Sequence, residues 1–432
     1  MQKKIINIGM AGYGTVGKGV SRIIQEKNDL LSEKVGAGLR LKRICDKSFK
    51  TVNAAGIYTK KIEDIFNDPE IDIFVELIGG YQPAKRFILL ALDKKMSVVT
   101  ANKDVLSHDF AEILQHARRN RRRIYFEASV GGGIPIIAAL NEGLCANRVS
   151  GITAILNGTT NFILTEMSQK KETFKRALRK AQKAGFAESD PTRDIAGFDS
   201  ASKLAILSSM VFGTHVRPED IFTRGIETVE QLDLSYAGEF GYAMKLFAVM
   251  KTCPEPGGNI YLQVAPAFVR DGHPLASVNG EYNAIYVNTD AAGDMMFYGK
   301  GAGSLPAASA VVSDIVYTAR HILERSARHI PFLELKKTKL NIADVNDIES
   351  CFYIRLTTVD KPGVLARISN ILADYRISID SVIQKEGSSP SAVPIVMLTH
   401  RAKMGNIVSA LTAIDSLKII RKKTVFYEIL EI

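Results

Sequence analysis

A glycine-rich turn near the start of the chain restricts its fold more than any other feature. The apolar run Lys4–Ala11 has the composition of a buried strand, and Gly12, Gly14 and Gly17 follow it in the pattern G-x-G-x-x-G, at the start of a helical pattern. These glycines allow a tight turn, close approach of a pyrophosphate and helix-on-strand packing, while the helix N-terminus attracts the anion. The turn predicts a nicotinamide dinucleotide site, with a purely structural glycine turn as the alternative.

Short β-type runs alternate with helical patterns through the first 128 residues, which is typical of βαβ units and a parallel sheet. The expected strands are Lys4–Ala11, Arg40–Cys45, Ile71–Leu77, Ser97–Thr100 and Ile124–Glu127. We therefore assign residues 1–128 to an α/β, Rossmann-type, doubly wound NAD(P)-binding domain.

The end of the second expected strand bears on the choice of cofactor. Asp46 follows Cys45 at the place where an acidic residue binds the ribose hydroxyls of NAD. Arg43, Lys47 and Lys50 lie close by in the sequence and could instead receive the 2′-phosphate of NADP. The sequence leaves NAD and NADP open.

Two further regions follow. Residues 129–334 combine helical patterns at Phe174–Ala184 and Ala201–Phe212 with β-type runs at Ile260–Val264 and Ala284–Val287, which indicates an α+β substrate-binding and dimerisation domain. The polar stretch Leu335–Glu349 is expected to be a connector. Residues 350–432 then follow the order strand, helix, strand, strand, helix, strand.

Composition excludes some classes of protein. Of 432 residues, 46% are apolar and 24% charged, which is ordinary for a globular protein of several domains. The net charge of +10 is compatible with nucleic acid, a membrane surface or an anionic cofactor. The five arginines between residues 118 and 123 end a helical pattern and lack interleaved aromatic residues, so the helix dipole explains them better than nucleic-acid binding does.

The cysteines and the apolar runs point to a reducing, aqueous environment. Cys45, Cys145, Cys253 and Cys351 lie far apart, in no pattern that indicates zinc or a disulfide framework. No run approaches the ~18 apolar residues of a membrane span, and the start of the chain lacks a signal-peptide pattern. We expect a soluble, unprocessed cytoplasmic protein that binds neither membranes nor nucleic acid.

Two lysines and an aspartate are candidate catalytic groups. Lys103 follows the expected strand Ser97–Thr100, at the sheet edge where doubly wound folds bind ligands; a surface lysine that starts a helix is the alternative. Asp199 and Lys203 are four residues apart on one helix face, with Asp199 as an acceptable N-cap. A solvated ion pair is the simpler explanation, but the apolar residues after Lys203 direct this helix end toward the core.

The loop from Ala181 to Lys203 resembles the signature of homoserine dehydrogenases at every fixed position. The resemblance extends, in order, to the glycine turn, Thr100–Lys103, Glu127–Pro135, Asn157–Phe162 and Gly299–Gly303. It implies NAD(P)-dependent interconversion of L-homoserine and L-aspartate 4-semialdehyde, in the biosynthesis of threonine, methionine and isoleucine.

The resemblance also implies roles for individual residues. Lys203 is the acid/base group, Lys103 lies close to it, and either lysine stabilises the alkoxide. Asp199 orients the lysine or a water, and Glu188 binds the substrate ammonium. Asp194 assists or braces the loop, and Thr159 contributes to substrate binding. The implied cofactor-binding residues are Gly12, Gly14, Thr15, Val16, Gly17, Asp46, Thr100, Lys103, Gly185 and Gly303.

One segment matches a monovalent-cation site of that family. The implied ligands are the Glu127 carboxylate and the backbone carbonyls of Val130, Gly132 and Ile134. Such oxygen ligands suit a hard cation, Na⁺ or K⁺, and offer no soft ligand for zinc. A glycine-rich bend that needs no ion is the alternative.

The C-terminal segment resembles an ACT domain, a small effector-binding βαββαβ module. Leu356–Ile368, with the turn Pro362-Gly363, matches its first strand and loop, and Ile377–Gln384 and Val393–Thr399 supply further strands. In this family such a module implies feedback inhibition by threonine; a module that dimerises without a ligand is the alternative. We expect a homodimer or homotetramer.

These features together predict a single-function homoserine dehydrogenase, since no kinase-length segment precedes the glycine turn. One alternative is another amino-acid dehydrogenase or semialdehyde reductase on the same scaffold; a semialdehyde dehydrogenase would need a nucleophilic cysteine, which these motifs lack. The other is a non-catalytic sensor of dinucleotide and amino acid, against which the intact set Lys103, Glu188, Asp199 and Lys203 argues.

Overall fold

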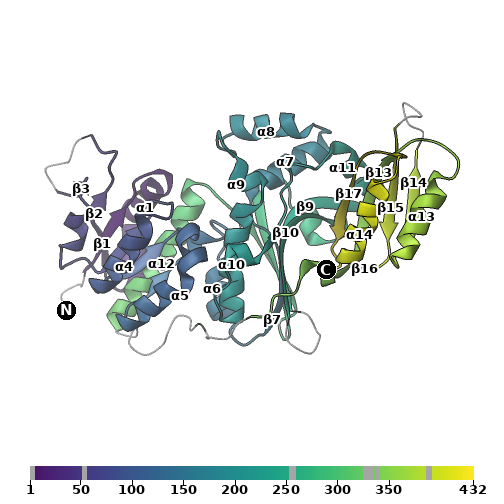
Figure 1. Cartoon of the computed structure of the whole chain (residues 1–432). Helices are drawn as coiled ribbons and strands as arrows, with labels where there is room; N and C mark the ends of the chain where they lie inside the picture. The colour runs from purple at the N-terminus through teal and green to yellow at the C-terminus, as the bar shows by residue number, and fades with distance from the viewer. Residues whose placement is uncertain (1–4, 51–55, 253–258, 325–334, 336–339, 386–391) are drawn as a thin grey trace. The chain divides into compact units, whose positions relative to one another are not determined.

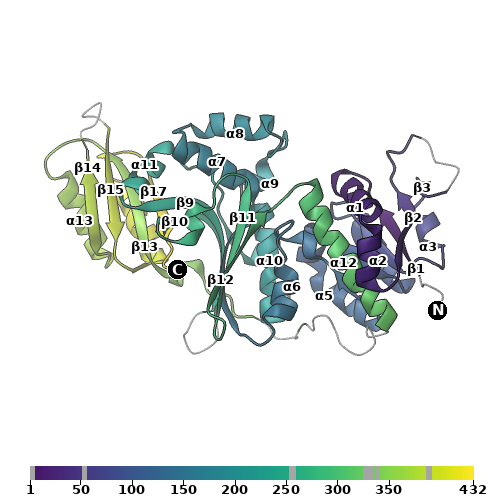
Figure 2. The same cartoon turned by 180° about the vertical axis from the view of Figure 1, so that it is seen from behind.

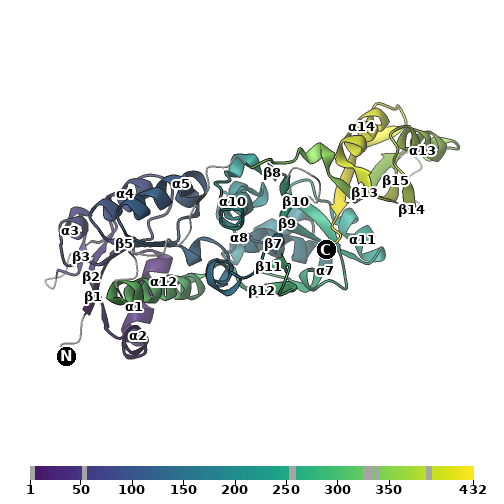
Figure 3. The same cartoon turned by 90° about the horizontal axis from the view of Figure 1, so that it is seen from below.

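The computed structural model describes residues 5–50, 56–252, 259–324, 335, 340–385 and 392–432. Its contacts divide the chain into two compact units, each assembled from separate segments. The first unit contains Met1–Gly158, Phe198–Ile221 and Glu281–Leu340. The second contains Thr159–Gly197, Phe222–Gly280 and Asn341–Ile432. Figures 1, 2 and 3 show the chain from three sides.

The first unit contains a parallel sheet of six strands in the order β3-β2-β1-β4-β5-β6. This is the strand order of doubly wound dinucleotide-binding folds, whose order reverses between β1 and β4. The strands are β1 (Ile5–Ala11), β2 (Gly38–Cys45), β3 (Tyr58–Thr59), β4 (Ile73–Glu76), β5 (Ser97–Thr100) and β6 (Ile124–Tyr125). The helices that pack with the sheet are α1 (Thr15–Glu26), α2 (Asn28–Val35), α3 (Glu63–Phe66), α4 (Ala84–Asp93), α5 (Lys103–Arg119) and α12 (Ser304–Glu324).

Helix α12 joins this sheet from a distant part of the sequence. Figure 2 shows α12, in green, beside the purple helix α1, and the Ser304 hydroxyl donates to the Thr15 carbonyl at 2.7 Å across 289 positions. At Gly19 of α1 a Cβ would lie 2.8 Å from the Cβ of Ala308. Buried Val311 and Ile315 of α12 complete the core under β1. The start of α1, where the glycine turn ends, is therefore held by α12.

The first unit also contains an antiparallel group in the order β12-β11-β7. Its strands are β7 (Val149–Ile155), β11 (Tyr282–Thr289) and β12 (Asp294–Lys300). Helix α10 (Phe198–Phe212) packs on α5. The short elements of this unit are η1 (Glu127–Ser129), α6 (Ile136–Ala138), η2 (Ala139–Gly143) and η3 (Pro218–Asp220).

The second unit is built on the long antiparallel pair β9 (Tyr242–Thr252) and β10 (Ile260–Arg270), with β8 (Phe222–Thr223) parallel to β10. Its other elements before the C-terminal module are α7 (Gly158–Gln169), α8 (Phe174–Lys183), α9 (Thr192–Ile195), α11 (Gln231–Glu239) and η4 (Pro274–Ser277).

The C-terminal module of the second unit has the expected order of strands and helices. It contains β13 (Glu349–Thr358), α13 (Val364–Asp374), β14 (Ile379–Gln384), β15 (Val393–Thr399), α14 (Met404–Asp415) and β17 (Ile420–Ile429), with short η6 (Val345–Asp347) and β16 (Ala402–Lys403). Helices α13 and α14 cover one face of the sheet β17-β13-β15-β14, as Figure 3 shows. Strand β17 runs parallel to β10 at Ala267 and Phe268, and the Phe268 ring packs on Tyr353 and Tyr427.

The fold class expected from the sequence is confirmed, several element bounds differ by a few residues, and two of the differences bear on the site. The strand predicted over Ile124–Glu127 ends at Tyr125, because the chain turns into η1 and the buried Glu127 side chain bonds to backbone N–H groups of α6. The helix predicted from Ala201 begins at Phe198, after Gly197 at φ +88°. Asp199 therefore lies inside the first turn and is not an N-cap. Lys4 and residues 336–339 of the connector lie outside the described residues.

None of the helices among the described residues has the length and apolar character needed to cross a membrane. Cys45, Cys145 and Cys351 are free thiols. Cys253 lies outside the described residues.

Candidate active site

Two lysines of the first unit meet one aspartate. Lys203 Nζ lies 2.6 Å from Asp199 Oδ2, and Lys103 Nζ lies 3.3 Å from Asp199 Oδ1. Asn157 Nδ2 donates to Oδ2 at 2.9 Å. The Asp199 and Lys203 side chains are 11% and 13% exposed, so this is not the solvated surface pair that was the simpler explanation of the sequence. The three predicted catalytic residues therefore lie together.

The electrostatics of this cluster keep Asp199 ionised. Burial opposes the charge, but Lys203, Lys103 and the hydrogen bonds from Lys203 and Asn157 hold the pKa of Asp199 well below its usual range. Lys203 Nζ also donates to the Leu156 carbonyl at 2.7 Å. An ammonium group has three donors, and two of those on Lys203 have these partners among the described residues. The third is available for a substrate oxygen.

Local structure explains why these side chains converge. Lys103 is the first residue of α5, directly after β5, and Asn102 caps this helix by accepting from the Val105 N–H at 3.2 Å. Asn157 follows β7, and Asp199 and Lys203 are i and i+4 residues of α10, which packs on α5. Two elements that pack together thus present their cations to one carboxylate.

Glu76 is a residue of this region that the sequence analysis missed. It ends β4, is fully buried, and accepts from Thr100 Oγ1 at 2.7 Å and from the Ile78 N–H at 2.8 Å. Burial raises its pKa, although these hydrogen bonds oppose the shift. Thr100 Oγ1 accepts in turn from the Asn102 N–H at 3.0 Å. Glu76 therefore fixes the β5–α5 junction that carries Lys103, and the acid at the end of an apolar strand was the signal for it.

The glycine turn has the geometry that a bound pyrophosphate requires. Gly12 has φ +99°, and a Cβ there would lie 2.4 Å from the Leu77 carbonyl oxygen. At Gly17 a Cβ would lie 2.2 Å from the Gly12 carbonyl oxygen, whereas nothing lies within 4 Å of a Cβ at Gly14. Gly12 and Gly17 are thus needed by the fold, and Gly14 leaves space at the N-terminus of α1, where Thr15 and Val16 begin the helix. That space fits a phosphate group.

Asp46 lies beside this turn. Its carboxylate accepts from the Tyr13 N–H at 2.6 Å, and from the N–H and hydroxyl of Ser48 at 2.8 and 2.6 Å. Burial opposes ionisation, but these hydrogen bonds lower the pKa of Asp46. Arg43 lies 3.9 Å from Asp68 and donates to the Lys42 carbonyl, so its side chain is already engaged there. Lys47 and Lys50 are exposed.

Four of the predicted site residues belong to the second unit. Thr159 is buried and donates through Oγ1 to the Phe186 carbonyl at 2.7 Å. Gly185, at φ +77°, follows α8, and Glu188 lies exposed on the loop beyond it. Asp194 lies in α9. The start of α7 thus contacts the base of the loop that carries Glu188.

Glu127, one of the predicted cation ligands, forms a buried pair of acids with Asp314 in the first unit. The Glu127 carboxylate accepts from the N–H groups of Ile137 and Ala138, both at 2.8 Å, and the Glu127 N–H donates to Asp314 Oδ2 at 2.8 Å. Burial raises the pKa of Glu127 to about 7 and that of Asp314 well above its usual value. Gly131 and Gly132 have φ +72° and +59°, left-handed values that reorient the backbone of this segment. Among the described residues no basic side chain pairs with Glu127 or Asp314, and two such buried acids in a segment with Val130, Gly132 and Ile134 fit a hard cation.

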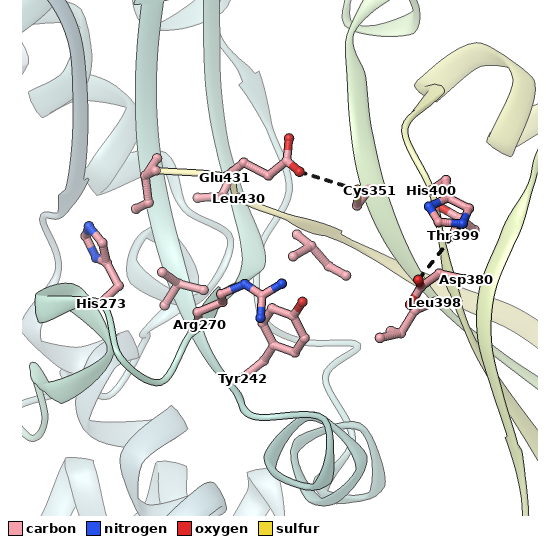
Figure 4. A pocket seen from close by; sticks show the side chains of 13 residues that line it. Tyr242, Arg270, His273, Cys351, Asp380, Leu398, Thr399, His400, Leu430 and Glu431 are labelled. Atoms are coloured by element: carbon pink, nitrogen blue, oxygen red, sulfur yellow. Dashed lines mark hydrogen bonds and ion pairs between the residues drawn. The ribbon is translucent and has the colours of Figure 1, made fainter.

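A pocket of about 510 Å³ lies in the second unit, where the C-terminal module meets β10. Figure 4 shows Arg270 at its centre, beside Tyr242, with Glu431 near Cys351 and Asp380 near His400. The Arg270 guanidinium lies 5.5 Å from the centre of the Tyr242 ring, and no ion pair joins it to a carboxylate among the described residues. This pocket lies beyond the N-terminal end of β13, whereas Pro362-Gly363 follows the other end of that strand.

Three family models match successive parts of the chain. Residues 12–127 match the model described as homoserine dehydrogenase, NAD binding domain, and residues 135–316 match homoserine dehydrogenase. Residues 352–417 match the ACT domain.

Known proteins resemble the chain over almost its whole length. The homoserine dehydrogenase of Neisseria gonorrhoeae is 38% identical over 425 residues, 97% of each chain. The crystal structure of a homoserine dehydrogenase from Thiobacillus denitrificans is 38% identical, with a TM-score of 0.93 over 99% of each chain. A hyperthermophilic archaeal homoserine dehydrogenase in complex with NADPH is 28% identical, with a TM-score of 0.62 over 73% of this chain and 97% of its own.

Proposed function

The chain belongs to the homoserine dehydrogenase family, an NAD(P)-dependent oxidoreductase family, and on that basis we propose that Lys203 and Lys103, joined by Asp199, catalyse the interconversion of L-homoserine and L-aspartate 4-semialdehyde. The observation that carries these roles is the convergence of both ammonium groups on one buried, ionised carboxylate. A purely structural ion pair would need only one lysine. We place the reaction in the biosynthesis of threonine, methionine and isoleucine.

The cluster supplies a proton and a place for negative charge. When bound, the nicotinamide carries the hydride that adds to the aldehyde carbon or leaves the alcohol carbon. As the aldehyde is reduced, the Lys203 ammonium donates a proton to the forming alkoxide; in the oxidation, Lys203 takes the hydroxyl proton. Lys103 stabilises the same oxygen. Asp199 stays ionised throughout and holds both lysines in place.

Substrate binding is proposed for residues of the second unit. Glu188 binds the substrate ammonium as a charge-assisted hydrogen bond. Its exposed position is compatible with this role. Asp194 and Thr159 assist, Thr159 through its contact with the loop at Phe186. These assignments follow from the match of the loop to the family signature.

Cofactor binding is proposed for the residues around the glycine turn and for those that match the family beyond it, namely Gly12, Gly14, Thr15, Val16, Gly17, Asp46, Thr100, Lys103, Gly185 and Gly303. The open space at Gly14 supports the pyrophosphate site. Gly303 directly precedes Ser304, which contacts Thr15. Thr100 contributes through its backbone or through the junction that Glu76 fixes, since its hydroxyl already bonds to Glu76.

Asp46→Asn is expected to shift the preference of the enzyme toward NADP. An ionised carboxylate at the end of β2 accepts hydrogen bonds from a ribose 2′-hydroxyl and repels a 2′-phosphate. Asparagine removes the charge, so the ratio of kcat/KM for NADP⁺ to that for NAD⁺ should rise about tenfold, equivalent to about 1.4 kcal/mol. Arg43→Met serves as control because Arg43 is engaged by Asp68. An unchanged ratio in Asp46→Asn would place the ribose elsewhere.

A monovalent cation, Na⁺ or K⁺, is proposed at Glu127 with the carbonyls of Val130, Gly132 and Ile134. The raised pKa values of Glu127 and Asp314 support it, because a bound cation would offset the charge of this buried pair. Its role would be to shape the segment that follows β6. Thermal stability compared in KCl and in choline chloride checks the proposal, since a cation bound to the folded chain raises Tm.

The C-terminal module is proposed to bind threonine as a feedback inhibitor, at the turn Pro362-Gly363. Gly363, at φ +85°, precedes α13, whose first N–H groups suit a carboxylate. We also propose that the chain forms a homodimer or homotetramer. Its proposed domains are residues 1–128 for NAD(P) binding, 129–334 for substrate binding and dimerisation, and 350–432 for regulation.

L-Threonine is expected to lower the rate of homoserine oxidation and to give binding heat in calorimetry with the whole enzyme. Gly363→Val, which places a branched side chain at a left-handed residue before α13, should weaken both effects. Arg270→Met, in the pocket of Figure 4, should leave both unchanged. If Arg270→Met removes the binding heat and Gly363→Val does not, the effector binds in that pocket. If threonine neither changes the rate nor gives binding heat, the module does not bind threonine and the alternative, a module that only dimerises, is favoured.

A further inference from the structure

Residues 224–229, which we call the linking segment, contact the loop that carries Glu188 and Asp194. The Ile226 N–H donates to the Ile195 carbonyl at 2.8 Å. At Gly225 a Cβ would lie 2.2 Å from the same carbonyl oxygen and 2.6 Å from Ala196 Cα. The linking segment thus packs backbone against backbone on the end of α9, two residues before Gly197 and three before the start of α10. All of these residues belong to the second unit except α10 itself.

The C-terminal module holds the other side of the linking segment. The Arg224 guanidinium lies 5.1 Å from the centre of the Phe426 ring and 5.4 Å from that of Tyr427, both on β17. The Tyr427 hydroxyl donates to the Thr228 carbonyl at 3.5 Å. Arg224 Nε is buried and has no hydrogen-bond partner among the described residues. The cation is therefore held by aromatic faces, an interaction that depends on its charge.

A buried ion pair fixes the chain just beyond the linking segment. Asp233, in the first turn of α11, accepts from Tyr353 Oη at 3.0 Å and from Arg355 Nη2 at 3.0 Å, both on β13. The Asp233 and Arg355 side chains are 0% and 3% exposed. Removal of one partner from such a pair leaves a buried charge, so this contact is strongly fixed. Strand β17 thus contacts the linking segment and β13 fixes the helix that follows it, while the Arg224 N–H also donates to the Val264 carbonyl of β10 at 2.8 Å.

We propose that Arg224 is a positioning residue for substrate binding. It acts through the linking segment: β17 holds Arg224, the linking segment holds Ile195 and Ala196, and these fix the loop that bears Glu188 and Asp194. The C-terminal module therefore contributes to homoserine binding even when it carries no effector. This inference rests on the substrate role proposed above for that loop.

Steady-state kinetics of Arg224→Met in the whole enzyme tests the inference. Methionine keeps an unbranched apolar chain and removes the charge over the rings. We expect the KM for homoserine to rise about five- to tenfold while kcat and the KM for the cofactor stay within about twofold of wild type. Arg224→Lys, which keeps a cation over the rings, should restore the KM for homoserine to within about twofold. Arg270→Met is the matched control, because Arg270 also lies over a tyrosine ring, and within the described part of the chain no side-chain interaction joins it to the linking segment.

An unchanged KM for homoserine in Arg224→Met, or an equal rise in Arg270→Met, would overturn the inference. If Arg224→Met does not fold, Gly225→Ala tests the same inference, because it alters the contact between the linking segment and Ile195. Its methyl group must displace the Ile195 carbonyl as well as the Glu227 carboxylate, so the KM for homoserine rises if the link matters and stays unchanged if it does not. Glu188→Gln distinguishes the substrate role proposed for Glu188 from the positioning role inferred for Arg224. If Glu188→Gln raises the KM for homoserine and Arg224→Met does not, the link is wrong; if the reverse holds, the role proposed for Glu188 is wrong.

Discussion

Lys203→Ala is expected to lower kcat by about 10²–10⁴-fold, the usual contribution of a positioned acid/base group. The substitution removes the donor that lies 2.6 Å from Asp199 and leaves the glycine turn untouched. Cofactor binding should therefore remain, measured by quenching or enhancement of reduced-cofactor fluorescence. The loss should appear in kcat, because the proton transfer occurs only as the reaction proceeds.

Lys103→Ala is the matched variant, since Lys103 contacts the same carboxylate at 3.3 Å but is more exposed, at 31%. It should lower kcat less than Lys203→Ala does. If Lys203→Ala keeps more than about a tenth of the wild-type kcat, another group transfers the proton. A larger loss in Lys103→Ala would exchange the roles of the two lysines.

Gly14→Ala and Gly17→Ala are expected to damage the enzyme in different ways. At Gly14 the added methyl group enters space that is open in the structure, so the fold should keep its Tm while the Kd for NAD(P) rises at least about tenfold, ~1.4 kcal/mol. At Gly17 the methyl group would lie 2.2 Å from the Gly12 carbonyl oxygen. Such overpacking costs about 1–3 kcal/mol, so Gly17→Ala should lower both Tm and cofactor affinity.

Thermal unfolding and a cofactor titration of both variants provide the measurements. Gly36→Ala is the control for a methyl group added in open space outside the turn, because nothing lies within 4 Å of a Cβ there; Gly36 is left-handed and Gly14 is not, so this control also adds backbone strain. Gly36→Ala should lose some Tm and no cofactor affinity. Normal cofactor affinity in Gly14→Ala would exclude this turn as the pyrophosphate site.

Local signals explain the parts of the molecule that the sequence predicted well. The strand before Gly12, the helix after it and the i, i+4 pair Asp199–Lys203 each depend on neighbouring residues, and the structure reproduces them. The C-terminal order of strands and helices was predicted for the same reason. The motifs matched a known family closely enough that the fold class was also correct.

Contacts between distant segments could not be predicted from the sequence. Helix α12 completes the core of the parallel sheet, although 289 positions separate Ser304 from Thr15. The bond between Lys103 and Asp199 depends on the packing of α5 on α10, and neither helix pattern encodes it. Glu76 and Arg224 stand outside every motif, and their partners become visible only once the chain is folded. The wrong boundary at Glu127 has the same origin, because its backbone N–H donates to Asp314, 187 positions away.

The aromatic contact between β10 and the C-terminal module makes that module part of the fold of the second unit. Deleting the chain beyond residue 340 would uncover the Phe268 ring, which now packs on Tyr353 and Tyr427, and would leave the β10 edge without β17. An apolar, unpaired strand edge favours aggregation. If the module carries the feedback inhibition proposed above, a variant free of that inhibition is better sought among single substitutions near Pro362-Gly363 than among shortened chains, since the module and β10 share one aromatic cluster in the second unit.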